Sequence, residues 1–384
     1  MMKTGIIGLG FIGPAHMEAL LRTGLSQIVA VADTNEQLAR SCAAKFNVPE
    51  VYSDYRQLLQ NPEINVVHIC TPNYLHYEIA KAALEAGKHV VCEKPLAICS
   101  KQAEELMRLA EEKGLTGVTS FNLRYYPLVQ QAREMVQTGK LGRLYAYHGS
   151  YLQDWLLYDT DYSWRLDSKV SGPSRAVADI GSHWFDMACF ITGSRVTELC
   201  ADLSTFLPVR KKSRTQCLTF QTPQSANDPM EYEEIAIDTE DFATILFRME
   251  NGIRGSLTIS QVSAGRKNFL QFEADGAESA LSWNSEQPNR LWIGHRDQCN
   301  EEMIKDPGLL QGQARKFASY PGGHAEGFPD TSKQLLEQVY SYLAEDGRRH
   351  GIKPQFPTFA DGWQEARLCE AILESSQQRR WVQL

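Results

Sequence analysis

A glycine-rich turn near the start of the chain constrains its fold more than any other feature. Residues 4–8 read as a strand too apolar to face water, and they lead into Gly8-Leu9-Gly10-Phe11-Ile12-Gly13, a G-x-G-x-x-G pattern. A helical pattern follows over residues 14–22, and then a second strand over residues 28–32 that ends at Asp33. This order predicts a dinucleotide-binding unit of the Rossmann type, in which an acidic residue follows the glycines by about 20 positions.

The glycines and the acidic residue each have a physical role in that prediction. Gly8 permits the tight turn, Gly10 lets the backbone approach a pyrophosphate, and Gly13 allows close packing of helix on strand. The unpaired N–H groups at the start of the helix then attract phosphate. Asp33 can accept hydrogen bonds from a ribose 2′-hydroxyl and would repel a 2′-phosphate, and no Arg follows it. The sequence therefore favours NAD over NADP as cofactor.

Strands and helices continue to alternate through the first third of the chain. The predicted strands cover residues 66–70, 89–92 and 115–120, and the predicted helices cover residues 36–46, 55–60, 74–86 and 100–113. Alternation at this spacing indicates right-handed βαβ units and a parallel sheet. We therefore predict an α/β NAD-binding domain over residues 1–124 and a second domain over residues 125–384.

Two strand ends of the first domain carry further candidate residues. Thr71-Pro72-Asn73 ends one strand, and His76 lies in the first turn of the helix that follows. Glu93-Lys94-Pro95 ends another strand, at the edge where an open α/β sheet binds its ligand. Whether His76 contacts the cofactor is left open at this point. His68 and His89 fall inside strands, and we expect them to belong to the core.

A carboxylate and an imidazole are spaced for acid–base chemistry in the second half. Residues 179–192 read as a helix, with Asp179 and His183 at positions i and i+4 on one face. A carboxylate there can orient an imidazole and stabilise its protonated form, as a general base for an alcohol requires. The alternative is an N-terminal Asp that favours the helix dipole beside a core His. The loop at residues 153–165 is rich in large aromatics, and it forms either a satellite core or a platform for a sugar ring.

Together these motifs resemble the glucose–fructose oxidoreductase / inositol dehydrogenase (Gfo/Idh/MocA) family. The matching features are the glycine turn, Asp33, Thr71-Pro72-Asn73, Glu93-Lys94-Pro95 and Asp179-Ile180-Gly181-Ser182-His183. The resemblance implies a two-domain dehydrogenase whose second domain is α+β with a large, mostly antiparallel sheet. One face of that sheet would form the active-site wall, and the other would be an oligomer interface, in a homodimer or a homotetramer.

The resemblance also implies a reaction, namely oxidation of a secondary hydroxyl of a cyclic sugar, anhydrosugar or cyclitol by hydride transfer to NAD. His183 would remove the hydroxyl proton, Asp179 would hold its tautomer and charge, and Lys94 would stabilise the developing alkoxide. In the alternative, Lys94 takes the proton, with its pKa lowered by burial. The candidate cofactor contacts are Gly8, Gly10, Phe11, Ile12, Gly13, Asp33, Thr71, Pro72, Asn73, His76, Glu93, Lys94 and Asn122. By likeness to the sugar-dehydrogenase branch, the candidate substrate contacts are Lys94, Tyr126, Gln153, Trp155, Arg165, Asp179, His183 and His324.

Two other functions remain open. An NAD-dependent glycosidase would oxidise the sugar transiently and release an aglycone without net NADH. A non-catalytic NAD-sensing regulator would have no need of Lys94, Asp179 and His183 together.

Composition narrows the setting in which the protein works. A formal net charge of −8 without a basic stripe argues against a nucleic-acid partner, and we expect Arg210-Lys211-Lys212-Ser213-Arg214 to be a solvated loop. The nine cysteines form no C-x-x-C pair and read as reduced thiols of a cytoplasmic protein. We expect no targeting segment, because the chain enters its first predicted strand at once, and no apolar run approaches membrane-spanning length. We predict no metal site.

Overall fold

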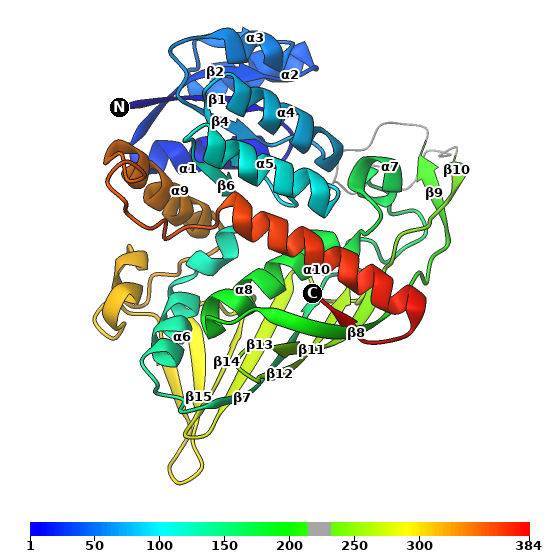
Figure 1. Ribbon diagram of the computed structural model, residues 1–384, viewed down its shortest axis with the longest axis vertical. Coiled ribbons are helices and arrows are strands. Elements are labelled where there is room, and N and C mark those ends of the chain that lie inside the picture. The colour runs from blue at the N-terminus through cyan, green and yellow to red at the C-terminus, as the bar shows by residue number, and fades with distance from the viewer. Residues whose placement is uncertain (214–231) are drawn as a thin grey trace. The chain divides into compact units, whose positions relative to one another are not determined.

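A six-stranded parallel sheet forms the centre of the first of two units in the computed structural model, which describes residues 1–213 and 232–384 (Figure 1). Its strand order is β3-β2-β1-β4-β5-β6, which confirms the predicted doubly wound fold. All four residues of β4 are buried, as expected for a strand covered on both faces. The strands are β1 (Met2–Ile7), β2 (Ser26–Ala32), β3 (Glu50–Tyr52), β4 (Val66–Ile69), β5 (His89–Cys92) and β6 (Gly117–Thr119). The helices are α1 (Ile12–Thr23), α2 (Glu36–Phe46), α3 (Tyr55–Gln60), α4 (Asn73–Glu85), α5 (Ser100–Glu112) and the short η1 (Asn122–Tyr125).

The first unit is completed by a segment from near the end of the chain. It comprises Met1–Tyr125 and Gly327–Arg367, whereas the second unit comprises Tyr126–Glu326 and Leu368–Leu384. The chain first passes from one unit to the other after Tyr125, one residue from the domain boundary that we predict at residue 124. Residues 327–367 differ from the predicted division, because they pack with the first unit. This segment holds α9 (Phe328–Ala344) and the start of α10 (Phe359–Gln378). The ring of Phe359 lies against Gly117, where an added Cβ would stand 2.4 Å from it.

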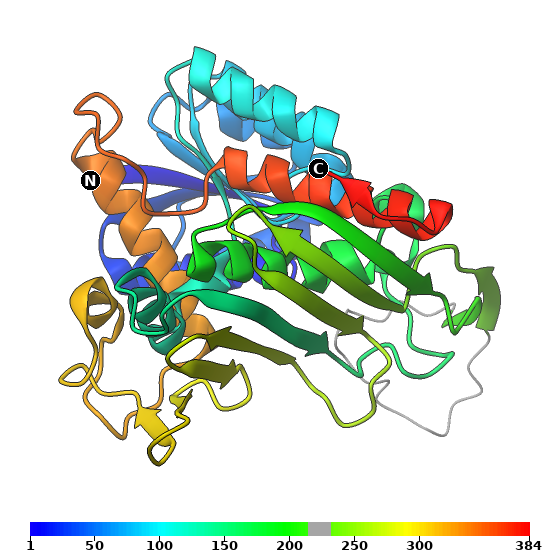
Figure 2. The ribbon, with the colours of Figure 1, turned by 60° about the horizontal axis from the view of Figure 1, so that its bottom comes forward.

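A nine-stranded sheet forms the second unit, and it is antiparallel except between β7 and β12 (Figure 2). Its order is β16-β15-β14-β13-β7-β12-β11-β8-β17. These strands are β7 (Leu144–Leu152), β8 (Val196–Ser204), β11 (Phe242–Met249), β12 (Arg254–Ser260), β13 (Phe269–Gly276), β14 (Ala280–Asn284), β15 (Arg290–Gly294), β16 (Glu301–Ile304) and β17 (Val382–Gln383). The helical elements are α6 (Pro127–Gln137), η2 (Trp164–Leu166), α7 (Ser168–Ser171), η3 (Val177–Gly181), α8 (Ser182–Thr192) and η4 (Gly312–Phe317).

The strands of the large sheet alternate between a covered face and an open face. In β11, Ile245 and Phe247 are buried, whereas Leu246 between them is exposed. The covered face packs on α8 through a cluster of aromatic rings, in which Trp184 of α8 lies 5.2 Å from Tyr147 and 5.8 Å from Phe247 between ring centroids. This packing confirms the expected α+β second domain and fixes α8 on the sheet.

The basic run that follows β8 corrects a sequence prediction. Residues 209–213 form the strand β9 (Val209–Ser213), which pairs with β10 (Tyr232–Ala236) in a separate two-stranded sheet. Arg210 is fully buried rather than solvated. The alternation of side chains along β9 turns Arg210 inward, where a carboxylate and backbone carbonyls accept hydrogen bonds from its N–H groups. Its position in a run of basic residues therefore does not indicate its burial. Arg214 lies outside the described residues.

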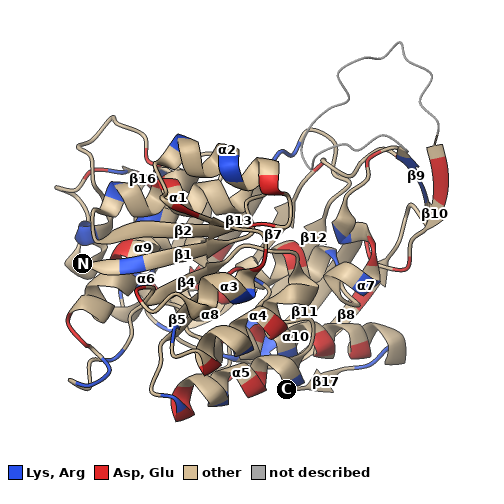
Figure 3. Cartoon of the chain, turned by 90° about the horizontal axis from the view of Figure 1, so that it is seen from above, with Lys and Arg blue, Asp and Glu red and all other residues tan. Residues whose placement is uncertain are grey.

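Charged residues of both signs occur throughout the part of the chain that the structure describes. Lys and Arg are interspersed with Asp and Glu along the elements of both units (Figure 3). Among the helices of the described residues, none has the length and apolar character needed to cross a membrane.

Candidate active site

The glycine turn after β1 has the close packing that the fingerprint predicts. Gly8 has a φ of 90°, and an added Cβ would stand 2.7 Å from the carbonyl of Cys70 at the end of β4. At Gly13 an added Cβ would lie 2.2 Å from the carbonyl oxygen of Gly8. At Gly10 an added Cβ would meet nothing within 4 Å, so this backbone is open to a ligand. The turn therefore forms a cradle that suits a pyrophosphate, at the point where the strand order reverses.

The Asp33 carboxylate lies beside this turn. Its Oδ2 accepts a hydrogen bond from the N–H of Leu9 at 2.8 Å, and its Oδ1 accepts one from the N–H of Asn35 at 2.8 Å. These bonds fix the carboxylate at the end of β2 and leave each oxygen able to accept another. A ribose with both hydroxyls suits this position, as predicted for NAD. Of the other turn residues, Phe11 is 69% exposed and Ile12 begins α1.

At the end of β4, Thr71 supplies a second observation that fits a cofactor. Among the described residues, its hydroxyl oxygen is buried with no hydrogen-bond partner. Such a group costs free energy unless a ligand completes its hydrogen bonding. Pro72 and Asn73 follow, and Asn73 is the first residue of α4.

Two of the predicted cofactor contacts have clear structural roles. His76 is 1% exposed, and its Nδ1 lies 2.7 Å from the carbonyl oxygen of Pro95 while its Nε2 lies 2.8 Å from that of Thr71. It therefore joins the loops that follow β4 and β5; burial lowers its pKa, against these two hydrogen bonds, which raise it. Asn122 donates from Nδ2 to the hydroxyls of Thr331 at 2.8 Å and Ser332 at 3.1 Å, which ties η1 to α9. Direct contact of either with the cofactor stays a prediction.

Lys94 lies on the loop after β5, next to Glu93, which forms an ion pair with His16. The Lys94–Pro95 peptide is cis, and the backbone N–H of Lys94 lies 3.3 Å from Oε2 of Glu93. The other carboxylate oxygen, Oε1, lies 2.9 Å from Nε2 of His16 on α1. We did not single out His16 in the sequence. Its place three residues after Gly13, on the helix face that turns back to the sheet, is the signal that could have found it.

Both members of this pair have perturbed ionisation. Burial disfavours the charged form of His16, but Cys70 and Glu93 outweigh it and raise the pKa of His16 to about 10. Burial also disfavours the Glu93 carboxylate, but the hydrogen bond and charge of His16, with the charge of Lys94, lower the pKa of Glu93 to about 2. The pair is therefore an imidazolium and a carboxylate at neutral pH.

In the second unit, Asp179 lies in the π-helical turn η3, which runs directly into α8. The helix that we predict over residues 179–192 is therefore present without a break, but its first turn is the wider π-helical turn. Glu240 anchors its start, because Oε1 accepts from the Ser174 hydroxyl at 2.8 Å and from the N–H groups of Arg175 and Val177 at 2.9 Å each. His183 lies in the first turn of α8 and is 8% exposed.

Two side chains from other elements hold the Asp179 carboxylate. Nε2 of Gln261 donates to Oδ2 at 3.0 Å, and Nε of Arg165 lies 3.5 Å from Oδ1. Gln261 follows β12, is fully buried, and in turn accepts a hydrogen bond from Nη1 of Arg175 at 3.2 Å. Sequence reasoning missed Gln261, because nothing in its neighbourhood marks a pairing across 82 residues.

A fully buried charge cluster of Arg175, Arg210 and Asp241 lies next to these residues in the hydrogen-bond network. Arg175 and Arg210 both pair with Oδ1 of Asp241, at 2.5 Å and 2.9 Å, and all three side chains are 0% exposed. Burial disfavours the Asp241 carboxylate, but Arg175 outweighs it, so the pKa of Asp241 is lowered. Nη1 of Arg210 also donates to the carbonyls of Tyr158 at 2.9 Å and Asp161 at 3.2 Å. The cluster thus holds both the helix that carries Asp179 and the aromatic loop.

Hydrogen bonds order the start of the aromatic loop, at the edge of the sheet where β7 ends and β13 begins. Gln153, after β7, accepts from Nε1 of Trp155 at 2.8 Å and donates to Oδ1 of Asn268 at 2.8 Å. Asn268 precedes β13 and also accepts from the Tyr151 hydroxyl at 2.8 Å. This set joins two predicted substrate contacts to two residues that we had not predicted.

Tyr126 and His324 are the remaining predicted substrate contacts. Tyr126 is buried, with its ring 5.1 Å from that of Trp283. His324 is exposed on the loop that precedes α9, and among the described residues its hydrogen bonds reach only Pro321 and Gly322 of its own loop. Their contact with substrate stays a prediction.

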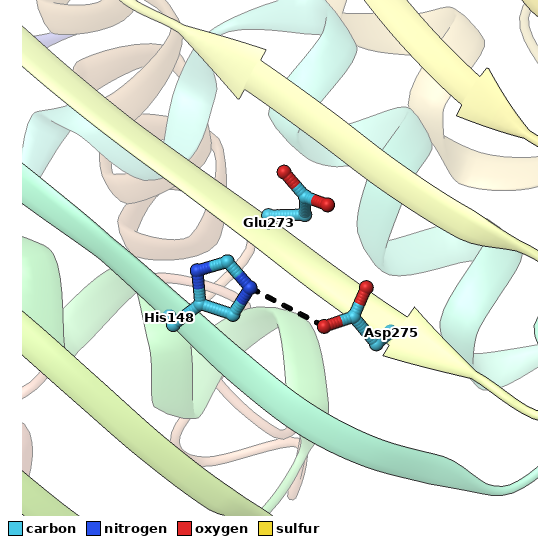
Figure 4. A group of neighbouring side chains, drawn as sticks. All are labelled: His148, Glu273 and Asp275. Atoms are coloured by element: carbon cyan, nitrogen blue, oxygen red, sulfur yellow. Dashed lines mark ion pairs between the residues drawn. The ribbon is translucent and has the colours of Figure 1, made fainter.

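One group of side chains has the composition of a metal site, although the sequence predicts none. His148 of β7 and Glu273 and Asp275 of β13 lie on the open face of the large sheet, with possible ligand atoms within 4.8 Å of one another (Figure 4). Nε2 of His148 lies 3.3 Å from Oδ2 of Asp275, so an ion pair already accounts for their approach. All three side chains are partly exposed, and such groups are common on surfaces without a metal ion.

Fold and site together define a class, an oxidoreductase with an NAD-binding Rossmann unit and a sheet-based second unit. Residues 2–121 match the model of the Gfo/Idh/MocA oxidoreductase family with its NAD-binding Rossmann fold, and residues 129–282 match the model of the C-terminal domain of the same family. The chain belongs to this family, which confirms the resemblance drawn from its motifs.

Several relatives are similar along nearly the whole chain. Levoglucosan dehydrogenase of Pseudarthrobacter phenanthrenivorans is 31% identical, with 99% of this chain and 97% of the relative covered. A solved levoglucosan dehydrogenase in complex with NADH and L-sorbose has a TM-score of 0.88 at 29% identity, covering 100% of this chain and 98% of the other. An inositol dehydrogenase homologue from Azotobacter vinelandii, solved with NAD⁺, has a TM-score of 0.86 at 25% identity over 100% and 97% of the two chains.

Proposed function

We propose that this protein is an NAD-dependent dehydrogenase that oxidises a secondary hydroxyl of a cyclic sugar, anhydrosugar or cyclitol. The observation that carries the proposal is the Asp179 carboxylate, fixed by Gln261 and Arg165 on the helix that also presents His183. A fixed carboxylate one turn from an imidazole suits proton removal from an alcohol. The names and ligands of the relatives support the substrate class.

Each of three residues has a role in this proposal. His183 takes the hydroxyl proton, and Asp179 stabilises the resulting imidazolium and holds its ring. Lys94 provides positive charge to the developing alkoxide. The predicted alternative, in which Lys94 takes the proton, uses the same residues with the roles exchanged. When bound, NAD supplies the acceptor for the carbinol hydride, and Asp33, the glycine cradle and Thr71 would hold it.

The test is NADH formation with NAD or NADP over a panel of monosaccharides, anhydrosugars, inositols and sugar acids. We expect a substrate that works with NAD, and we expect Lys94→Ala and His183→Asn to abolish most of the activity. His350→Asn is a matched control, because His350 is exposed and has no part in this proposal. Near-normal turnover of His183→Asn would exclude His183 as the base, and the pH–rate profile of Lys94→Arg would then identify Lys94.

The redox-neutral glycosidase uses the same NAD-binding unit and acid–base residues, so it is the second candidate. Its signature is release of an aglycone from a glycoside with NAD bound and no net NADH. Silence of the whole panel, with NAD still bound by the protein, would favour this function. A non-catalytic NAD-sensing role would instead leave cellular function unchanged in Lys94→Ala.

The proposed setting is the cytoplasm, in a homodimer or homotetramer. The nine cysteines form no C-x-x-C pair, which agrees with reduced thiols in a reducing compartment. The open face of the large sheet, which exposes Leu246 and Trp292, supports self-association through this face. Sedimentation of the wild type against Leu246→Lys tests the interface, because a charge at its centre should dissociate the oligomer.

A further inference from the structure

A chain of buried polar side chains begins at the strand end that carries Lys94 and runs through the first unit. His16 lies 2.9 Å from Glu93 through its Nε2, and 2.9 Å from His68 of β4 between the two Nδ1 atoms. His68 continues through Nε2 to the hydroxyl of Tyr340 on α9, at 2.9 Å. His16, His68 and Tyr340 are each no more than 2% exposed. The proposed reaction uses none of these three residues.

From Tyr340 the chain continues through hydroxyl groups to the backbone of β1. The Tyr340 hydroxyl lies 2.7 Å from that of Thr4, which lies 2.7 Å from that of Ser26. The Ser26 hydroxyl donates to the carbonyl oxygen of Met2 at 3.0 Å. The chain therefore ends on a group that can only accept a hydrogen bond.

Proton counting along this chain fixes the charge of His16. If His16 carries both ring protons, it donates to Glu93 and to His68, and every later group donates to the next as far as the Met2 carbonyl. If His16 is neutral and donates only to Glu93, His68 must donate back to it. The hydroxyls then have one proton too few, so one hydrogen bond of the buried chain is lost, which costs free energy. The geometry thus favours an imidazolium at His16.

We propose that His16 is a positioning residue for Lys94, acting as a buried imidazolium that fixes the Glu93 carboxylate beside the backbone N–H of Lys94. The inference rests on the proposed function, in which Lys94 provides charge to the alkoxide. Glu93 has two fixed oxygens, one on His16 and one on the backbone of Lys94. Loss of the first contact leaves the carboxylate to the Ser120 hydroxyl and the N–H of Lys94, and the loop that presents Lys94 loses one anchor, while His76 still holds Pro95. A small misplacement of such a group can cost ~10²-fold in rate.

The charged and titratable groups that act on this pair come from several elements. They are His16 of α1, Cys70 after β4, His76 of α4, Cys92 of β5, Lys94 after β5, and the hydroxyl of Ser120 after β6. Burial lowers the pKa of His76, against its hydrogen bonds to the carbonyls of Pro95 and Thr71, and burial raises the pKa of Cys92. Removal of His16 takes away the hydrogen bond and the charge that most lower the pKa of Glu93, so burial should then raise that pKa.

The experiment compares His16→Gln, Glu93→Gln, the double variant and Lys94→Ala, with His89→Gln as the matched control. His89 lies at the opposite end of β5, where its Nδ1 accepts from the N–H of Thr116. We expect His16→Gln to lower kcat ~10²-fold with little change in NADH affinity, measured by fluorescence titration. We also expect a new acid limb in its kcat profile, from protonation of Glu93. The double variant should lack that limb and lose no more rate than the worse single variant.

Each outcome decides between this inference and the proposed function. Activity retained by Lys94→Ala contradicts the proposed function itself. Loss in Lys94→Ala with normal kinetics in His16→Gln overturns the positioning role alone. A slow His16→Gln variant without an acid limb, with losses that add in the double variant, indicates a merely structural role and also overturns it. Should His16→Gln fail to fold, ¹⁵N NMR of histidine-labelled wild type decides: both His16 ring nitrogens should be protonated at pH 8, and a neutral ring refutes the inference.

Discussion

Replacing Asp241 by Asn should destabilise the second unit far more than an ordinary surface change. The substitution keeps the shape of the side chain but removes the charge that Arg175 and Arg210 share, and all three side chains are 0% exposed. Removing one partner of a buried ion pair costs ~3–5 kcal/mol, because the remaining charge is left buried and unpaired. For a domain of this size, each kcal/mol shifts Tm by ~2–4 °C, so we expect a loss of about 6–20 °C.

The pH dependence of this loss follows from the depressed pKa of Asp241. Burial would raise that pKa, but the hydrogen bond and charge of Arg175 outweigh it and lower it. A lowered pKa in the folded state means that the ionised carboxylate stabilises above the unfolded-state pKa of ~3.9. The difference between wild type and Asp241→Asn should therefore be constant near neutral pH and shrink as pH falls through the folded-state pKa.

Thermal and urea denaturation followed by tryptophan fluorescence measure the effect. The matched control is Asp238→Asn, because Asp238 lies three residues away, is exposed, and pairs with the Ser168 hydroxyl at 2.9 Å. We expect the control to lose less than ~0.5 kcal/mol. Equal stability of the two variants would refute the reasoning, since a buried charge cluster would then contribute no more than a surface hydrogen bond.

Three further predictions concern the NAD-binding unit. Thr71→Val puts a methyl group of the same shape in place of a buried hydroxyl that has no hydrogen-bond partner among the described residues. Calorimetry should therefore show an unchanged or higher Tm but weaker NADH binding. Unchanged affinity for NADH would argue against a contact between Thr71 and the cofactor. Gly13→Ala places a Cβ 2.2 Å from the Gly8 carbonyl oxygen, whereas Gly10→Ala meets nothing within 4 Å; only the first should lower the Tm of the protein without cofactor, and equal effects would contradict the packing argument. Asp33→Ser removes the carboxylate that would repel a 2′-phosphate, so the ratio of kcat/KM for NAD over NADP should fall at least ~10-fold, and an unchanged ratio would show that another group selects the cofactor.

Most of the fold could be predicted because its elements follow local rules. The buried run at residues 66–69 and the alternation of Ile245 and Phe247 with Leu246 are visible in the sequence as strand patterns. The glycine turn and Asp33 could also be predicted, because tight turns and strand-end carboxylates depend on residues close in sequence.

What could not be predicted depends on contacts between residues far apart in the chain. Gln261 becomes a partner of Asp179 only when η3 packs against β12, as Gly181 does on Ile259, and the local sequence does not encode this packing. Arg210 lies in a run of basic residues, yet strand alternation turns its side chain onto Asp241. His16 reads as an ordinary helix residue until β4 and β5 bring His68 and Glu93 to it. In each case the role of the residue depends on a polar partner that lies far away in the sequence.

The return of residues 327–367 to the first unit has a consequence for how the protein is made. The ribosome releases residues 1–125 first, but the partners of Thr4, His68 and Asn122 on α9 are synthesised only after the strands of the other unit. At translation rates of ~5–20 residues per second, synthesis from Tyr125 to Tyr340 lasts about 11–43 s. During that time the nascent first unit exposes the polar groups that α9 later covers, and Gly117 without the ring of Phe359 against it. The earliest part of the chain is thus among the last to be completed, and a chain that stops early would leave the cofactor-binding unit unfinished.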